Sequence, residues 1–313
     1  MKNLVTLTII LIAFTGCDPE RTIVSPKKYV TDDLEVSETQ QAFLLETTAT
    51  WCQYCPNGAA SMLEMQSTYN VSGDSNIRVI GFASHTNDAL ETPVQTLFSS
   101  TFTTSGIPNF YVNNVDAGQS ISGPTGAAVG STPVVGVSHK AQDNIAGDST
   151  IVDIKVQFFQ EKKNITYYVQ SYLLVTGIEA REYNIGGLTV DLNQISSVPI
   201  VTTGSGNTPT KWAVDTFGKK AGDIYTHDHI PLASASTNFN WGIKLDSINP
   251  LGKSYFAGDI FGSEYTPIQL KIHKSVQGTP IPEDVNYEVV TIIWSERFDG
   301  EPGVLFVNGF QGN

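Results

Sequence analysis

The sequence predicts an α/β region followed by an all-β region. Between residues 42 and 112, short apolar runs typical of buried strands alternate with segments typical of helices. Beyond about residue 130, apolar and polar residues alternate over short segments separated by Gly, Asn or Pro, as in antiparallel sheets. The 27 Gly and 15 Pro also favour strands and turns over a helix bundle.

The α/β region should contain strands and helices in alternation. Short apolar runs predict the strands, and longer segments with helix-forming apolar residues predict the helices. The expected elements are a strand at 42–45, a helix at 56–70, a strand at 77–83, a helix at 88–99 and a strand at 110–112. This order implies a crossover connection between parallel strands.

The β region should form an antiparallel sandwich, either immunoglobulin-like or jelly-roll-like. Apolar residues at every second position of 152–158 have the period of a half-buried strand. Further strands are expected at 167–175, 187–192, 268–273 and 285–293. A stretch rich in Gly, Pro and Ser at 122–133 marks the boundary, which divides the chain into domains at 39–130 and 131–313.

The N-terminus is typical of an export signal. Lys2 precedes an apolar run at 4–14, which is too short to span a membrane. The Cys17 that follows resembles the lipobox of bacterial lipoproteins, in which cleavage before the Cys exposes it for lipid attachment. We therefore expect a signal peptide at 1–16 and a lipidated Cys17 that begins a tether at 17–38. The alternative is a plain secreted protein in which Cys17 is incidental.

The charge balance narrows the classes of partner. Asp and Glu outnumber Lys and Arg by 31 to 18, which gives a net charge of −13. Such an acidic surface repels phosphate backbones, so no nucleic-acid partner is expected. We expect envelope or surface proteins as partners, a membrane reached through the N-terminal lipid, and no cofactor.

Two cysteines remain once Cys17 is assigned to the lipid. Cys52 and Cys55 form a C-x-x-C pair, and no second pair or C-x-x-C-H motif suggests a zinc ribbon or haem attachment. The pair is either redox-active or a small structural disulfide. Its place between a strand and a helix puts Cys52 at the helix N-terminus, where backbone N–H groups stabilise a thiolate. Cys55, one turn later, would then resolve a mixed disulfide.

Residues 51–56, Trp-Cys-Gln-Tyr-Cys-Pro, resemble a thioredoxin-fold active site. Residues 106–112, Gly-Ile-Pro-Asn-Phe-Tyr-Val, resemble the segment in which thioredoxins place a cis-proline opposite the redox pair. The resemblance implies a cis bond before Pro108 and a backbone there that pairs with substrate. It also implies that Glu46 is the buried acid that exchanges a proton with Cys55, with a pKa raised by burial.

The likeness extends over most of the mature chain, although it is loose outside the C-x-x-C region. Segments 46–52, 225–229 and 289–294 resemble the outer membrane protein 28-related family. These are cell-envelope lipoproteins of gram-negative bacteria with a thioredoxin-like N-terminal part and a β-rich C-terminal part. The resemblance implies a lipid-anchored protein of the envelope, at the outer membrane, and it brings no substrate with it.

Two functions stay open. The first is thiol–disulfide exchange on envelope proteins, with Cys52 as nucleophile, Cys55 as resolver, Glu46 as proton shuttle and Pro108 as substrate clamp. The second is a non-catalytic surface lipoprotein that acts in binding, adhesion or assembly, with Cys52–Cys55 as a structural disulfide.

One His-x-His pair is of a type that can bind a metal ion. His227 and His229 alternate on a possible strand, so both side chains could face one way. Only Asp228 is near them in the sequence, on the opposite face, and we expect a structural pair with no metal.

Overall fold

A four-stranded sheet near the N-terminal side carries the segment with the two cysteines. The computed structural model describes residues 34–70, 77–144, 146–197, 200–201, 208–237, 239–274, 282, 284–297 and 304–312. The strand order is β2-β1-β3-β4, with β1 parallel to β2 and antiparallel to β3. The strands are β1 (Ala42–Thr48), β2 (Val79–His85), β3 (Asn109–Val112) and β4 (Val115–Gly118). The signal peptide, Cys17 and the tether up to residue 33 lie outside the described residues.

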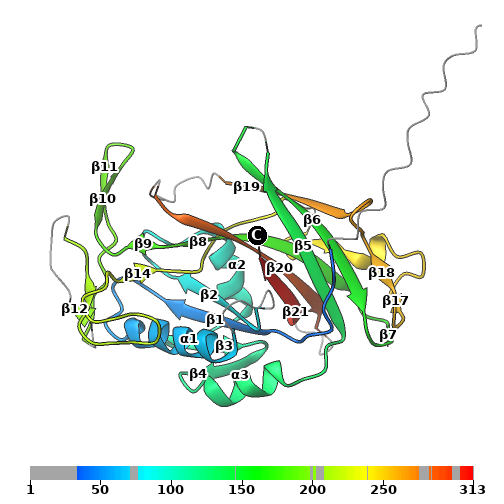
Figure 1. Ribbon diagram of the computed structural model, residues 1–313, viewed down its shortest axis with the longest axis horizontal. Coiled ribbons are helices and arrows are strands. Elements are labelled where there is room, and N and C mark those ends of the chain that lie inside the picture. The colour runs from blue at the N-terminus through cyan, green and yellow to red at the C-terminus, as the bar shows by residue number, and fades with distance from the viewer. Residues whose placement is uncertain are drawn as a thin grey trace, which may run out of the picture. The chain divides into compact units, whose positions relative to one another are not determined.

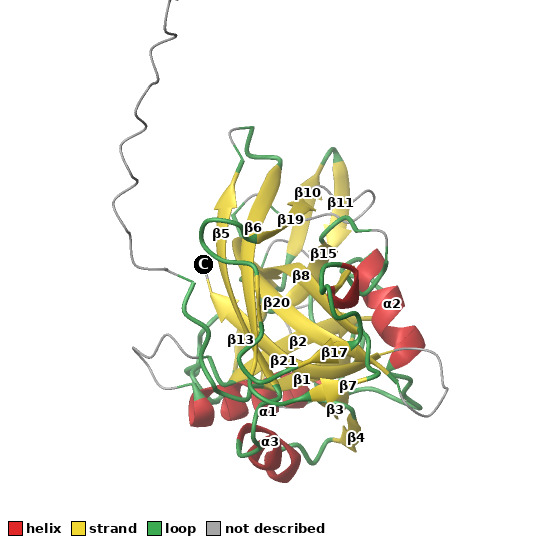
Figure 2. Cartoon of the chain, turned by 90° about the vertical axis from the view of Figure 1, so that its right-hand side faces the viewer, coloured by secondary structure: helices red, strands yellow, loops and turns green. Residues whose placement is uncertain are grey.

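Helices cover both faces of this sheet (Figures 1 and 2). They are α1 (Cys55–Tyr69), α2 (Pro93–Thr101) and α3 (Ser122–Val129). Side chains alternate across a strand. Leu44 of β1 therefore shares a core cluster with residues of α1 and α3, whereas Phe43 packs against α2.

Two helices differ from expectation. Helix α2 begins at Pro93 rather than at residue 88, because the residues before it form a turn in which the Asp88 carboxylate accepts a hydrogen bond from the Leu90 N–H. Helix α3 occupies the stretch that the sequence marked as a boundary. Its composition gives little helical signal, but it packs on β1 and β3, and the Arg78 guanidinium donates to the Val129 carbonyl at 2.6 Å.

Two larger antiparallel sheets make up most of the remaining chain. One has the order β15-β8-β20-β21, with β16 also paired to β8. The other has the order β18-β6-β19, with β5 also paired to β6. The strands of the first are β8 (Tyr167–Thr176), β15 (Ile230–Ser234), β16 (Ile243–Lys244), β20 (Asn286–Glu296) and β21 (Val304–Gly312); those of the second are β5 (Val135–Asp143), β6 (Ser149–Phe158), β18 (Ile260–Phe261) and β19 (Ile268–His273).

Several short two-stranded pairs lie outside these sheets. Among them the β10–β11 hairpin projects at one end of the molecule in Figure 1, while Tyr183 and Val190 of its strands pack against the core of the two larger sheets. The short strands are β7 (Lys162–Lys163), β9 (Ile178–Glu179), β10 (Glu182–Ile185), β11 (Leu188–Asp191), β12 (Ile200–Val201), β13 (Lys211–Trp212), β14 (Thr226–His227) and β17 (Ser254–Tyr255), and a 3-10 turn spans Leu245–Ser247.

The N-terminal sheet shares a core with the β-rich region. Phe43 and Phe82 pack in one cluster with Tyr172, Trp294 and Phe306, and the Trp294 indole donates to the Tyr172 hydroxyl at 3.0 Å. A second cluster lies between the two larger antiparallel sheets. Residues 34–313 accordingly belong to one compact unit. The domain boundary at residue 130 stays a prediction.

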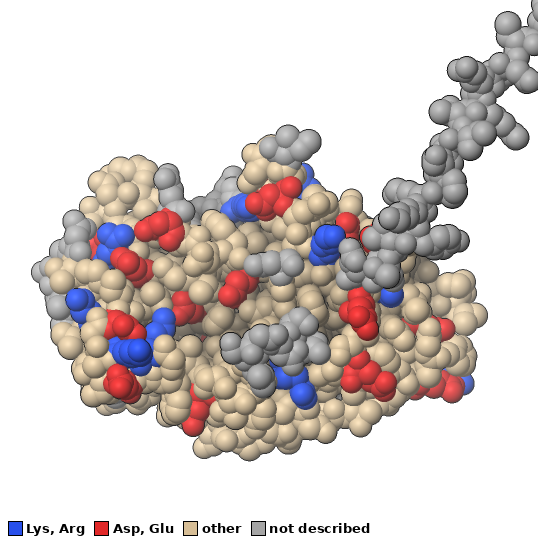
Figure 3. All heavy atoms as spheres, in the orientation of Figure 1, with Lys and Arg blue, Asp and Glu red and all other residues tan. Residues whose placement is uncertain are grey.

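The β-rich character of the fold is confirmed. The strand expected at 268–273 is β19, and those expected at 152–158 and 167–175 fall within β6 and β8. On the face shown in Figure 3, acidic and basic side chains are interspersed. No helix within the described part of the chain is long and apolar enough to cross a membrane.

Candidate functional site

Cys52 and Cys55 form a disulfide in the turn between β1 and α1, with their Cα atoms 5.4 Å apart. Cys52 is 5% exposed and Cys55 is fully buried, whereas the flanking Trp51 and Tyr54 are about half exposed. Helix α1 begins at Cys55, one residue before the expected start at 56, and Cys52 lies three residues ahead of its first residue rather than at the helix N-terminus. The reason is local: the Cys55 N–H bonds to the Cys52 carbonyl, so Cys52 belongs to the turn ahead of the helix.

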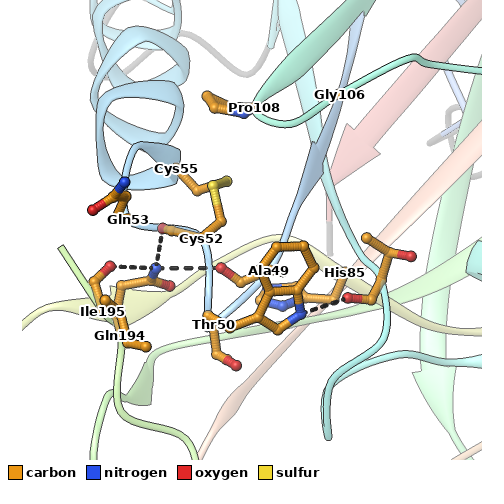
Figure 4. The surroundings of a disulfide bond; sticks show 12 residues. Ala49, Thr50, Cys52, Gln53, Cys55, His85, Gly106, Pro108, Gln194 and Ile195 are labelled. Carbon is orange, nitrogen blue, oxygen red and sulfur yellow. Dashed lines mark hydrogen bonds between the residues drawn. A yellow bond between two sulfur atoms is a disulfide. The ribbon is translucent and has the colours of Figure 1, made fainter. Parts of the chain in front are cut away.

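The peptide bond between Ile107 and Pro108 is cis, as the resemblance implied. Ile107 packs against the cluster of Ala49, Cys52 and Cys55, which brings the start of β3 next to the disulfide. Pro108 and the disulfide lie opposite each other in Figure 4. The two segments that the sequence singled out therefore meet in space.

Glu46 lies on the face of β1 that α1 covers, and its side chain is 2% exposed. Burial raises the pKa of this carboxyl to about 8, although a hydrogen bond with Thr48 acts in the opposite direction. Its Oε1 atom has no hydrogen-bond partner among the described residues. A carboxyl with this pKa is protonated at neutral pH and can give or take a proton there.

Gly58 makes the close approach of α1 and Glu46 possible. A Cβ atom at this position would overlap Oε1 of Glu46 and would stand 3.0 Å from Cβ of Pro108. Because Gly58 follows Cys55 by three residues, both lie on the same side of α1. The missing side chain thus leaves the Glu46 carboxyl and Pro108 packed beneath the first turn of the helix.

A small cavity is lined by Glu46 and by residues of α1, β2 and the segment around β14. Its volume, measured as the space open to the centres of water molecules, is about 40 Å³. That is room for about three waters at roughly 10–15 Å³ each. Glu46 and Trp212 both line the cavity, and each carries a buried polar atom, Oε1 and Nε1 respectively, without a hydrogen-bond partner among the described residues.

The histidine pair lines the same cavity but does not form the expected alternating strand. Strand β14 ends at His227, and His229 has a φ of 58°, so the alternation breaks at that point. His227 donates from Nε2 to the Leu192 carbonyl at 2.9 Å, whereas His229 bonds to Glu288 and Gln66. Burial, followed by the charge of His85, lowers the pKa of His227 to about 4. Across the described residues no group of three or more His, Cys, Asp or Glu is arranged to hold a metal.

The backbone of residues 49–53, the cysteine loop, is held from both sides. On one side the Thr50 N–H donates to Asp88 at 2.7 Å, and Asp88 also bonds to His85 at 2.8 Å. On the other side residues 193–197, which we call the strap, bind the loop carbonyls. Figure 4 shows the amide of Gln194, within the strap, against the carbonyls of Ala49 and Cys52.

A surface groove runs beside the disulfide. It has a volume of about 420 Å³, measured in the same way, and is lined by side chains from the ends of β1 and β2, by α2 and by the segment before Pro108. Trp51 stands at its edge, with its indole N–H shared between the carbonyls of Thr86 and Asn87 at 3.3 and 3.2 Å. The groove therefore reaches from the exposed Trp51 to Gly106 and Ile107.

The structure brings together the four residues singled out by sequence: Cys52, Cys55, Glu46 and Pro108. It also adds three that sequence reasoning missed, namely Gly58, Asp88 and Gln194. A glycine one turn into a helix was a usable signal for close packing. Gln194 carried none, because it is a polar residue in a segment without periodicity.

Comparison with known proteins bears on the fold. No protein-family model matches the chain, and no curated protein matches it. Among solved structures the chain is similar to HBP35 of Porphyromonas gingivalis, with a TM-score of 0.54 and 18% sequence identity, over 89% of this chain and 76% of that one. At this level of identity the likeness concerns the fold alone.

Proposed function

We propose that this protein performs thiol–disulfide exchange through Cys52 and Cys55. The observation that carries the proposal is the packing of a buried carboxyl, that of Glu46, beneath the helix turn that begins with Cys55, with its Oε1 atom left without a hydrogen-bond partner among the described residues. A static disulfide has no need of an acid whose pKa is about 8 at its back. The N-terminal sheet with α1 to α3 is a thioredoxin-like domain in this proposal, and the two larger sheets are a β-sandwich.

The exchange takes place in two steps. In the reduced protein the Cys52 thiolate attacks a client disulfide, which forms a mixed disulfide and releases one client thiolate. The Cys55 thiol then gives its proton to Glu46 in the fraction of molecules in which that carboxyl is ionised, and attacks the Cys52 sulfur. That step forms the Cys52–Cys55 disulfide and releases the second client thiolate. In the opposite direction protonated Glu46 returns its proton to Cys55 as that sulfur leaves.

The groove between Trp51 and Ile107 is the place for the client segment. An extended peptide beside the backbone of Gly106 and Ile107 would pass close to Cys52. In this proposal Pro108 clamps that peptide through its backbone.

The remaining parts of the proposal concern location. The pattern before Cys17 supports a lipid-anchored protein of the cell envelope, most consistent with the outer membrane, as in the outer membrane protein 28-related family. The clients are then envelope or surface proteins, whose disulfides form outside the cytoplasm.

One observation favours the alternative of a structural disulfide in a binding or assembly protein. Both cysteines are nearly buried, and the loop around them is bonded to the strap and to Asp88. A structural disulfide has a reduction potential below about −300 mV, whereas working oxidoreductases lie between roughly −120 and −270 mV.

The deciding experiment measures this potential on the chain from residue 18 and then traps clients in cells. Cys55→Ser should accumulate mixed disulfides through Cys52, because the resolving thiol is missing. The double variant Cys52→Ser/Cys55→Ser is the control and should trap nothing. A potential below about −300 mV together with no trapped client would overturn the proposal.

A further inference from the structure

We propose that Gln194, supplied by the strap from the β-rich region, is a positioning residue that sets the reduction potential of the Cys52–Cys55 pair. The inference rests on the proposed function for its biological meaning, although the equilibrium it concerns can be measured on the protein alone. It would make the β-rich region part of the redox centre, rather than a separate attachment.

The contacts of Gln194 converge on the cysteine loop. Its side-chain Nε2 donates to the Cys52 carbonyl at 2.9 Å and to the Ala49 carbonyl at 3.2 Å, and it also lies 2.9 Å from the carbonyl of Ile195. The side chain is 1% exposed, so water does not replace these bonds. The carbonyl of the attacking cysteine is therefore held by a side chain 142 positions away in the sequence.

The rest of the strap acts on the same loop. The Ile195 N–H donates to the Thr50 carbonyl at 2.9 Å, and the Ser197 N–H donates to the Gln53 carbonyl at 3.0 Å. Four consecutive or nearly consecutive carbonyls of the loop thus find their partners in the strap. Pairing of four of the five loop carbonyls restricts the path of a backbone that has no regular secondary structure of its own.

The strap is anchored independently of the cysteines. Leu192, the residue before the strap, is fully buried in the core between the two larger sheets. Its N–H donates to the Arg181 carbonyl at 3.1 Å, and its carbonyl accepts the bond from His227 at 2.9 Å. None of these contacts involves Cys52 or Cys55, so the anchor of the strap does not depend on the disulfide.

Anchoring the loop affects the equilibrium between dithiol and disulfide. Forming the bond within one protein depends on how often the two thiols meet, that is, on the effective concentration of one near the other. The strap and Asp88 hold the loop in its closed shape from opposite sides, so little conformational freedom remains to be lost when the bond forms. Removing the Gln194 amide should loosen the reduced loop and make the disulfide less favourable.

The test compares Gln194→Ala with Gln170→Ala in a glutathione redox buffer. Gln170 is the matched control because it is also 1% exposed and also donates to two backbone carbonyls, those of Ala235 and Asn240. We expect the ratio of disulfide to dithiol to fall about three- to thirtyfold in Gln194→Ala and to stay unchanged in Gln170→Ala. A tenfold fall corresponds to a potential that is less negative by about 30 mV.

A second variant covers the case in which Gln194→Ala does not fold. Ser197→Pro removes both donors of Ser197 to the Gln53 carbonyl, the backbone N–H and the hydroxyl, and should shift the ratio in the same direction by a smaller factor. Unchanged ratios in the folded variants of both positions would overturn the inference. A potential below about −300 mV with no trapped client would instead defeat the proposed function, while a shift in Gln194→Ala would still support the role of the strap.

Discussion

Gly58 of α1 and Glu46 of β1 are packed so closely that a single methyl group at position 58 would collide with the carboxyl of Glu46. The same methyl group would press on Pro108. One missing side chain therefore sets the spacing between the helix that carries Cys55, the buried acid and the start of β3.

Replacing this glycine should cost stability despite the better helix propensity of alanine. We expect Gly58→Ala to lower the free energy of unfolding by about 1–3 kcal/mol, the usual cost of overpacking. Gly123 in α3 is the control, since nothing lies within 4 Å of its added Cβ. Gly123→Ala should raise the free energy by up to about 1 kcal/mol. Urea titrations of the two variants measure both; equal effects would contradict the close packing of Gly58.

The raised pKa of Glu46 predicts how stability depends on pH. The folded protein keeps this proton up to about pH 8, whereas the unfolded chain releases it near 4.5. Wild type should therefore lose stability relative to Glu46→Gln as pH rises from 4.5 to 8, by at most about 1.4 kcal/mol per pH unit. Outside that window the difference should be constant. Unfolding curves at pH 5, 6, 7 and 8 test this, and a gap that stays flat would show that the carboxyl is not perturbed.

Asp88 should stabilise the cysteine loop through both of its carboxylate oxygens. Oδ2 accepts from Thr50 and His85, and Oδ1 accepts from Leu90. An asparagine has only one such oxygen, so Asp88→Asn leaves a buried donor unpaired and should cost about 1–3 kcal/mol at pH 7. The control is Asp116→Asn, because Asp116 uses a single oxygen for both of its bonds and an asparagine can keep them.

The pH dependence expected for Asp88→Asn has the opposite sign to that for Glu46→Gln. Burial raises the pKa of Asp88. The hydrogen bond and charge of His85, together with the N–H groups of Thr50 and Leu90, lower it by more, so the net shift is downward from 3.8. The stability that ionised Asp88 confers is present above 3.8 and is lost as pH falls through its lower folded value. Wild type and Asp88→Asn should therefore converge in acid, which unfolding curves below pH 4 would reveal.

The shared core predicts that the two regions unfold together. Tyr172→Phe would leave the buried Trp294 N–H without its acceptor and should cost about 1–3 kcal/mol. Tyr54→Phe, on an exposed side chain, should change little. Tryptophan fluorescence and hydrogen exchange at β1 should report one coincident transition in wild type. Two separated transitions would mean that the core between Phe43 and Trp294 does not couple the regions.

Much of the secondary structure was predictable because its signals are local. The helix expected at 56–70 corresponds to α1, and the strand expected at 268–273 corresponds to β19, since periodicity and breakers act within a few residues. Helix α3 was missed because tertiary packing overrides its Gly- and Pro-rich composition.

The candidate site was likewise predictable only in part. The cysteine pair and the Pro108 segment carry short motifs that can be recognised in one chain. The strap carries none, because Gln194 and Ile195 act mainly through backbone and amide bonds to residues more than 140 positions away. Contacts of that kind depend on the path of the whole fold.

The packing of Phe306 and Trp294 against Phe43 has a consequence for biosynthesis. Strand β1 leaves the ribosome long before β20 and β21, which complete the apolar cluster around it. At about 5–20 residues per second this interval lasts on the order of tens of seconds. During that time Phe43 and Phe82 can pack against Phe98 of α2 but lack Trp294 and Phe306, so part of this apolar face stays uncovered until the last strands have been made.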